Sequence, residues 1–84
     1  MQTIFVDGTD YATGKEMHLA LKRMLNLPAY YGCNADALYD CLSERREVVN
    51  LRVFSWGNEN VAAALHKCAG VFEDLDGDVK VLGE

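Results

Sequence analysis

The chain has 84 residues, half of them hydrophobic and a quarter charged, with a net charge of −5. This length supports a single domain over residues 1–84 with one modest core, and the apolar content excludes intrinsic disorder. The acidic balance argues against direct nucleic-acid binding, which requires a basic patch, and favours a basic protein partner.

The sequence predicts neither a membrane-spanning segment nor a secretory signal peptide. All of them are far shorter than the ~18–20 residues that cross a bilayer. The N-terminal stretch MQTIFVDGTD lacks the basic region and the long apolar region of a signal peptide. We therefore expect a cytoplasmic protein.

The three cysteines predict neither a disulfide framework nor a zinc site, because they are odd in number and show no C-x-x-C spacing. Cys41 and Cys68 fall at core positions of predicted helices and are expected to be buried. Cys33 falls in a predicted exposed loop and is the more reactive candidate.

In the first part of the chain, residues 4–6 form a β-branched and aromatic run that ends at Asp7 and Gly8, which predicts a buried strand. Thr13 and Glu16 then form a capping-box pair that predicts the start of a helix. An apolar stripe with helical spacing follows and stops before Pro28: Met17, Ala20, Leu21, Met24 and Leu25.

In the second part, we expect a helix over residues 35–42, a charged connection over 44–47 and a strand over 48–54. A third helical stripe follows: Val61, Leu65, Cys68, Phe72 and Leu75. Gly77 is placed to stop that helix, and residues 79–82 form a closing strand. Alternating strands and helices predict an α/β fold, with a small parallel sheet packed against helices.

The segment LPAYYGCNADALYDCL, residues 27–42, carries the strongest functional signal. Pro28 ends the preceding helix, and Gly32 permits either a positive φ or the close approach of a partner. Asn34 is a good helix N-cap. Asp36 and Asp40 are one helical turn apart, so their like charges repel slightly. Such a pair suits presentation of negative charge to a basic target better than stabilisation of a helix.

This segment resembles the barstar family, the intracellular protein inhibitors of barnase-type ribonucleases, and weaker similarity covers most of the chain. The resemblance implies a three-stranded parallel sheet with helices against it. It also implies a non-enzymatic inhibitor that blocks the basic active site of a barnase-like, extracellular-type ribonuclease in a 1:1 complex. The alternative is a barstar-like binding module for another basic protein, without nuclease inhibition.

The resemblance also implies the partner-binding residues, which are Tyr30, Gly32, Asn34, Asp36, Tyr39, Asp40 and Asp74. Of the adjacent tyrosines, one is expected to be packed and the other exposed, with Tyr30 as the contact residue. Four positions depart from the family pattern. Arg45 stands where the family often has an aromatic contact residue, and Tyr39 stands where tryptophan is common. Cys33 replaces an acidic residue of the loop, and Asp74 replaces a longer glutamate.

Enzymatic and metal-binding alternatives are weaker. Asp36 and Asp40 could form a glycosidase-type acid–base pair or simply a solvated helix face, but no pocket that would raise one pKa is evident. His18 and His66 are expected at the surface or its boundary. The acidic run from Asp74 to Asp78 resembles a calcium loop, but its glycine comes two positions early. We therefore predict no catalytic residue, no metal and no cofactor.

Overall fold

The computed structural model describes residues 1–83 and has three parallel strands and three α-helices. The strands are β1 (Gln2–Asp7), β2 (Val49–Ser55) and β3 (Val79–Val81), in the order β1-β2-β3. The helices are α1 (Gly14–Met24), α2 (Ala35–Arg45) and α3 (Glu59–Asp74), and a short 3₁₀ turn (Gly8–Asp10) follows β1. This arrangement confirms the predicted α/β fold.

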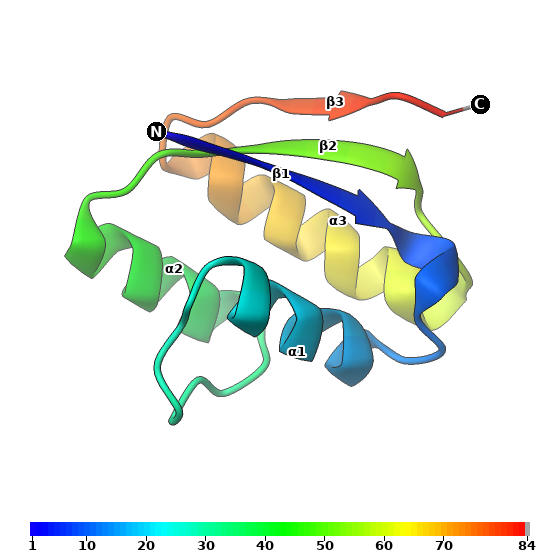
Figure 1. Cartoon of the computed structure of the whole chain (residues 1–84), viewed down its shortest axis with the longest axis horizontal. Coiled ribbons are helices and arrows are strands. Elements are labelled where there is room, and N and C mark those ends of the chain that lie inside the picture. Colours follow the sequence, from blue (N-terminus) through cyan, green and yellow to red (C-terminus); the bar gives the residue numbers. More distant parts are fainter. Residues whose placement is uncertain (84) are drawn as a thin grey trace.

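All three helices cover one face of the sheet, with α3 packed against both α1 and α2 (Figure 1). The other face is open, and the exposed side chains of Phe5 and Phe54 stack on each other there with ring centroids 6.2 Å apart. The inward side chains of the strands alternate with these exposed residues and are buried: Ile4, Val6, Val49, Leu51 and Val53. The core therefore lies between the sheet and the helices. None of the helices in residues 1–83 is long and apolar enough to cross a membrane.

The predicted helix starts are confirmed at the level of individual hydrogen bonds. Thr13 and Glu16 form the complete capping box of α1, and the Asn34 side chain accepts from the Ala37 N–H at 2.8 Å. Four residues of the third predicted stripe are fully buried on α3: Val61, Leu65, Cys68 and Phe72. The fifth, Leu75, is the residue that caps the end of α3 and is partly buried against the core.

The strands predicted at residues 4–6, 48–54 and 79–82 differ from β1, β2 and β3 by one or two residues at their ends. Two helix ends were also predicted wrongly. Helix α2 continues to Arg45, so Glu44 and Arg45 belong to the helix and not to a charged connection. The left-handed residue after α3 is Asp76, with φ 74°, and not Gly77.

All three helices end in the same hydrogen-bonded arrangement, a Schellman motif, in which the left-handed residue is not a glycine. These residues are Asn26, Arg46 and Asp76. In each motif the next N–H reaches back five residues, as Gly77 N–H does to the Phe72 carbonyl at 2.8 Å. The spacing of glycines therefore could not locate the helix ends.

Candidate functional site

Helix α2 separates a buried face from an exposed face, and the exposed face carries the predicted carboxylates. Leu38, Cys41 and Leu42 are buried in the core. Asp36, Asp40 and Glu44 are exposed and follow one another at four-residue spacing, so they form an acidic row along the helix. The ion pairs within residues 1–83 are Arg45–Glu47 and Arg52–Asp78. The acidic row is therefore not neutralised by an ion pair within that part of the chain.

The loop before α2 presents one tyrosine and buries the other, as predicted. Tyr30 is 82% exposed, whereas Tyr31 is 6% exposed. The Tyr31 N–H donates to the Pro28 carbonyl at 3.0 Å, which closes a tight turn around Tyr30. Tyr30 therefore projects from a tight turn, and the residue that follows it, Tyr31, is buried in the core.

Two hollows flank the C-terminal half of α2. One of about 150 Å³ is lined by Pro28, Tyr30, Cys41, Glu44 and Arg45. The other, of about 240 Å³, lies between the end of α2 and the end of α3. Its lining includes Ser43, Arg46, Glu47 and Asp74. The structure thus places Tyr30 and Asp74 next to α2, while Tyr39, 42% exposed, lies on the helix itself.

Gly32 does not have the positive φ that the sequence allowed; the left-handed residue of this loop is Cys33, with φ 56°. A Cβ added at Gly32 would meet the Asn34 amide at 3.4 Å and the Ala37 Cβ at 3.5 Å, which are ordinary contacts. Neither the backbone nor the packing of this chain therefore requires glycine at Gly32.

The Asn34 side chain is engaged within the chain on both of its polar atoms. It accepts from the Ala37 N–H and donates to the Gly32 carbonyl at 3.3 Å. This side chain therefore fixes the junction between the loop and α2.

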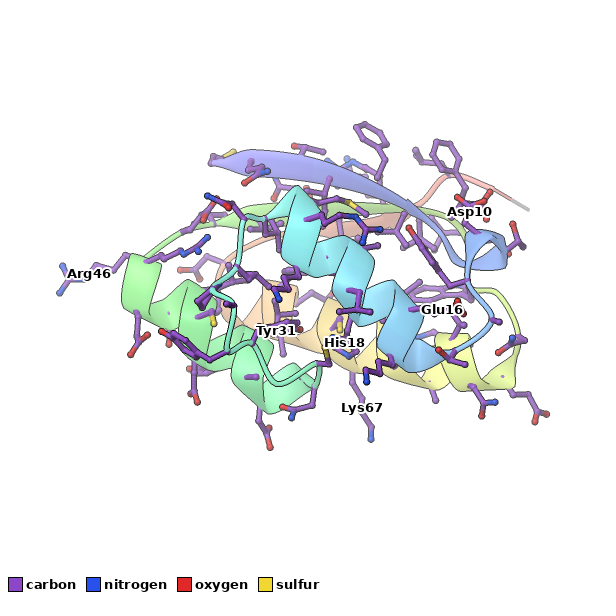
Figure 2. The ribbon with its side chains drawn as sticks, turned by 60° about the horizontal axis from the view of Figure 1, so that its bottom comes forward. Asp10, Glu16, His18, Tyr31, Arg46 and Lys67 are labelled. Atoms are coloured by element: carbon purple, nitrogen blue, oxygen red, sulfur yellow. The ribbon has the colours of Figure 1, made fainter. Side chains whose placement is uncertain are left out.

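The prediction for His18 was wrong, because this residue is buried and only 4% exposed. Its Nδ1 is 2.7 Å from the hydroxyl of Tyr31, and both residues are labelled in Figure 2. Its Nε2 is 3.8 Å from the Cys68 Sγ. Burial lowers the pKa of His18 and raises the pKa of Tyr31, and it raises the pKa of the Cys68 thiol to about 12. The three groups are therefore neutral near pH 7. They link α1, α3 and the loop over residues 27–33, which is called the Tyr30 loop below.

A signal for this network exists in the sequence. A buried tyrosine hydroxyl needs a polar partner, and His18 lies directly beside the apolar stripe of the preceding helix. His66, in contrast, is exposed as predicted and stacks on Trp56 with ring centroids 3.8 Å apart.

We expect the free energy of unfolding to fall as the pH drops from about 7.5 to about 5.5. The pKa of His18 is lower in the folded state than its ordinary 6.5, so the unfolded state takes up the proton first. Stability is thus fully present well above the unfolded-state pKa of 6.5 and declines as the pH falls through that value towards the lower folded-state pKa. Urea denaturation of the wild type and His18→Gln at several pH values checks this, since the variant should lose much of the slope. A wild-type stability that rises on acidification in this window would contradict the assignment.

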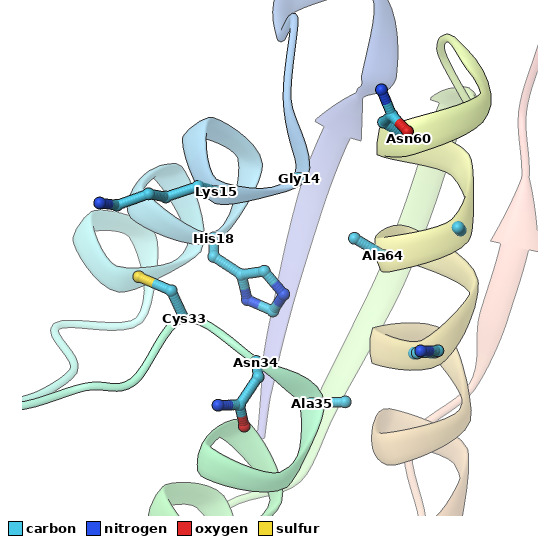
Figure 3. A pocket seen from close by; sticks show the side chains of 10 residues that line it. Gly14, Lys15, His18, Cys33, Asn34, Ala35, Asn60 and Ala64 are labelled. Carbon is cyan, nitrogen blue, oxygen red and sulfur yellow. The ribbon is translucent and has the colours of Figure 1, made fainter.

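A cavity of about 340 Å³ lies between α1, α3 and the start of α2 (Figure 3). Its lining includes Gly14, His18, Cys33, Ala35 and Ala64, and it does not contain Asp36 or Asp40. Cys33 is half-buried here instead of lying in a fully exposed loop, while Cys41 and Cys68 are buried as predicted. The acidic row and this cavity are therefore separate features.

The arrangement is unsuited to the catalytic alternatives. Acid–base catalysis by two carboxyl groups needs one of them desolvated, and both Asp36 and Asp40 are exposed. Within residues 1–83, His, Cys, Asp and Glu side chains form no group of three that could hold a metal ion.

These features define a small parallel α/β protein whose candidate site is an exposed acidic helix with an adjoining tyrosine loop. The chain belongs to the barstar family: the family model described as "Barstar (barnase inhibitor)" matches residues 1–80. It is also 46% identical over 43 residues to a Bacillus subtilis (strain 168) protein named "Putative ribonuclease inhibitor YrdF". That alignment covers 51% of this chain and 47% of the relative, so the two share about half their lengths.

Proposed function

We propose that this protein is a non-enzymatic inhibitor of a barnase-type ribonuclease and forms a 1:1 complex with it. Helix α2 and the loop over residues 27–33 would enter the basic cleft in which the enzyme holds RNA. Membership of the barstar family and the name of the Bacillus subtilis relative support this proposal.

The observation that carries the proposal is the acidic row on α2. Like charges at Asp36 and Asp40 repel each other, and neither belongs to an ion pair within residues 1–83. A pair that costs stability in the free protein gains favourable interactions when arginine and lysine side chains of a partner approach it. The two carboxylates would then occupy the positions of RNA phosphates.

Tyr30 and Tyr39 supply the apolar contact area of the proposed interface, because large exposed aromatic side chains are typical binding hot spots. Asp74 adds a further negative charge beside α2. Asn34 contributes by fixing the loop, since its amide is already engaged within the chain.

Gly32 supports the proposal in a different way. Within residues 1–83 no contact excludes a side chain there, and a glycine would let the partner backbone approach closely in the proposed complex. Gly32→Ala should therefore leave the melting temperature unchanged and weaken inhibition.

One observation favours the second candidate function, a binding module for another basic protein. The exposed Arg46 stands at the end of α2, beside the hollow that contains Asp74. This cation lowers the negative potential near the proposed site, which favours a partner less basic than a ribonuclease cleft.

The deciding experiment is an RNA-cleavage assay with a purified barnase-type ribonuclease. The wild-type protein should cleave no RNA and should abolish cleavage by the enzyme at a 1:1 ratio. The double variant Asp36→Asn, Asp40→Asn, which keeps the side-chain shapes, should inhibit far less. If the wild type leaves RNA cleavage unaffected but a pull-down captures a different basic protein, the second candidate function is correct.

A further inference from the structure

We infer that Arg45 is a positioning residue that clamps the start of the Tyr30 loop to the end of α2, an inference that rests on the proposed function. Its guanidinium donates from Nη1 to the Leu25 carbonyl at 2.7 Å and from Nη2 to the Asn26 carbonyl at 2.5 Å. These carbonyls lie 20 and 19 residues earlier in the chain, where α1 passes into the loop.

The other carbonyls at the end of α1 accept hydrogen bonds from groups other than Arg45. Arg45 therefore supplies the donors for the two carbonyls that remain, those of Leu25 and Asn26. The Leu21, Lys22 and Arg23 carbonyls accept from the backbone N–H groups of Leu25, Leu27 and Asn26, respectively. The Met24 carbonyl accepts from the Gln2 side chain at 3.3 Å. Without Arg45, the Leu25 and Asn26 carbonyls lose the side-chain donor that they have within residues 1–83.

The clamp lies directly beside the exposed tyrosine. Arg45, Glu44 and Tyr30 line the same hollow next to α2. Downstream, the loop is held by Tyr31, whose hydroxyl contacts His18 at 2.7 Å. Tyr30 therefore lies on a short segment that is fixed at one end by Arg45 and at the other by Tyr31.

A segment fixed at both ends loses little conformational freedom when a partner binds, so more of the contact energy appears as affinity. The planar guanidinium suits this role because it donates two hydrogen bonds in a fixed fork. Arg45 is an exposed residue, but both hydrogen bonds of its guanidinium point toward its own chain. Its contribution is thus geometric and does not consist of a charge offered to the partner.

The test compares Arg45→Lys, which keeps the charge and loses the fork, with Arg45→Met, which loses both. Arg52→Lys is the matched control, because Arg52 pairs with Asp78 at 2.7 Å on the sheet. Amide hydrogen exchange at Leu27 and Tyr31 should be faster by about tenfold or more in both Arg45 variants. Exchange of buried α3 amides should stay at the wild-type rate, and Arg52→Lys should leave the loop amides unchanged. Wild-type exchange at Leu27 and Tyr31 in Arg45→Met would overturn the clamp.

Inhibition of the barnase-type ribonuclease is the second readout. Arg45→Lys should lose affinity nearly as much as Arg45→Met, because the fork and not the charge positions the loop. Full inhibition by Arg45→Lys despite faster loop exchange would overturn the positioning role. If the wild type itself inhibits no such ribonuclease, the proposed function fails, whereas hydrogen exchange still decides whether Arg45 clamps the loop.

Discussion

Asp40→Ala should weaken binding to the ribonuclease by about 2–5 kcal/mol or more, mostly through faster dissociation. In the proposed complex, Asp40 lies at the centre of the acidic row and replaces a phosphate among buried cations. Its truncation leaves those cations desolvated and unpaired, and that penalty dominates the loss. Stopped-flow association and competition-based dissociation rates with one ribonuclease measure the two contributions separately.

Glu44→Ala is the matched control, because Glu44 belongs to the same exposed row but lies one turn further on, beside Arg45. As a rim charge it should cost at most about 1 kcal/mol. Added salt should slow association more than it speeds dissociation. Equal and small losses for both variants would show that the row is an ordinary solvated helix face.

Gly77→Ala should lower the free energy of unfolding by about 3 kcal/mol or more. An added Cβ would lie 1.9 Å from the Val49 carbonyl oxygen and 2.9 Å from the Phe72 carbonyl oxygen. Both are backbone atoms at the junction of α3, β2 and β3, so relief requires the chain to move. In a domain of this size the melting temperature should fall by about 12 °C or more, measured by circular dichroism.

Gly70→Ala is the opposite control, since it makes the same chemical change inside α3. Apart from its chain neighbours and the adjacent backbone of α3, no heavy atom of residues 1–83 lies within 4 Å of an added Cβ there, and alanine favours the helix by up to ~1 kcal/mol. Its melting temperature should therefore rise by up to about 8 °C. A stabilising Gly77→Ala or a strongly destabilising Gly70→Ala would mean that the end of α3 packs differently.

The sequence by itself determined the elements and the faces that they bury. The α3 stripe and the capping pair Thr13–Glu16 depend on residues no more than a few positions apart, and such local spacing maps directly onto a helix. The Asn34 cap followed from the same kind of pattern. The carboxylates Asp36 and Asp40 could likewise be placed on one helix face. Adjacency of the two tyrosines predicted that one is packed and the other exposed, and the resemblance to the barstar family assigned the exposed position to Tyr30.

Only the tertiary structure decided the roles of residues whose partners are distant in the chain. His18 is buried because Tyr31 and Cys68 reach it from 13 and 50 residues away. The sequence indicates that a buried tyrosine hydroxyl needs a polar partner, but it does not identify His18 as that partner. In the sequence, Arg45 stood where the family often has an aromatic residue that contacts the partner. In the structure, its guanidinium donates hydrogen bonds to two carbonyls about 20 residues earlier. Gly77 is required by a carbonyl of β2 and not by its own φ. Hydrogen bonds and close approaches of this kind depend on how elements pack, and the sequence spacing within one element carries no information about them.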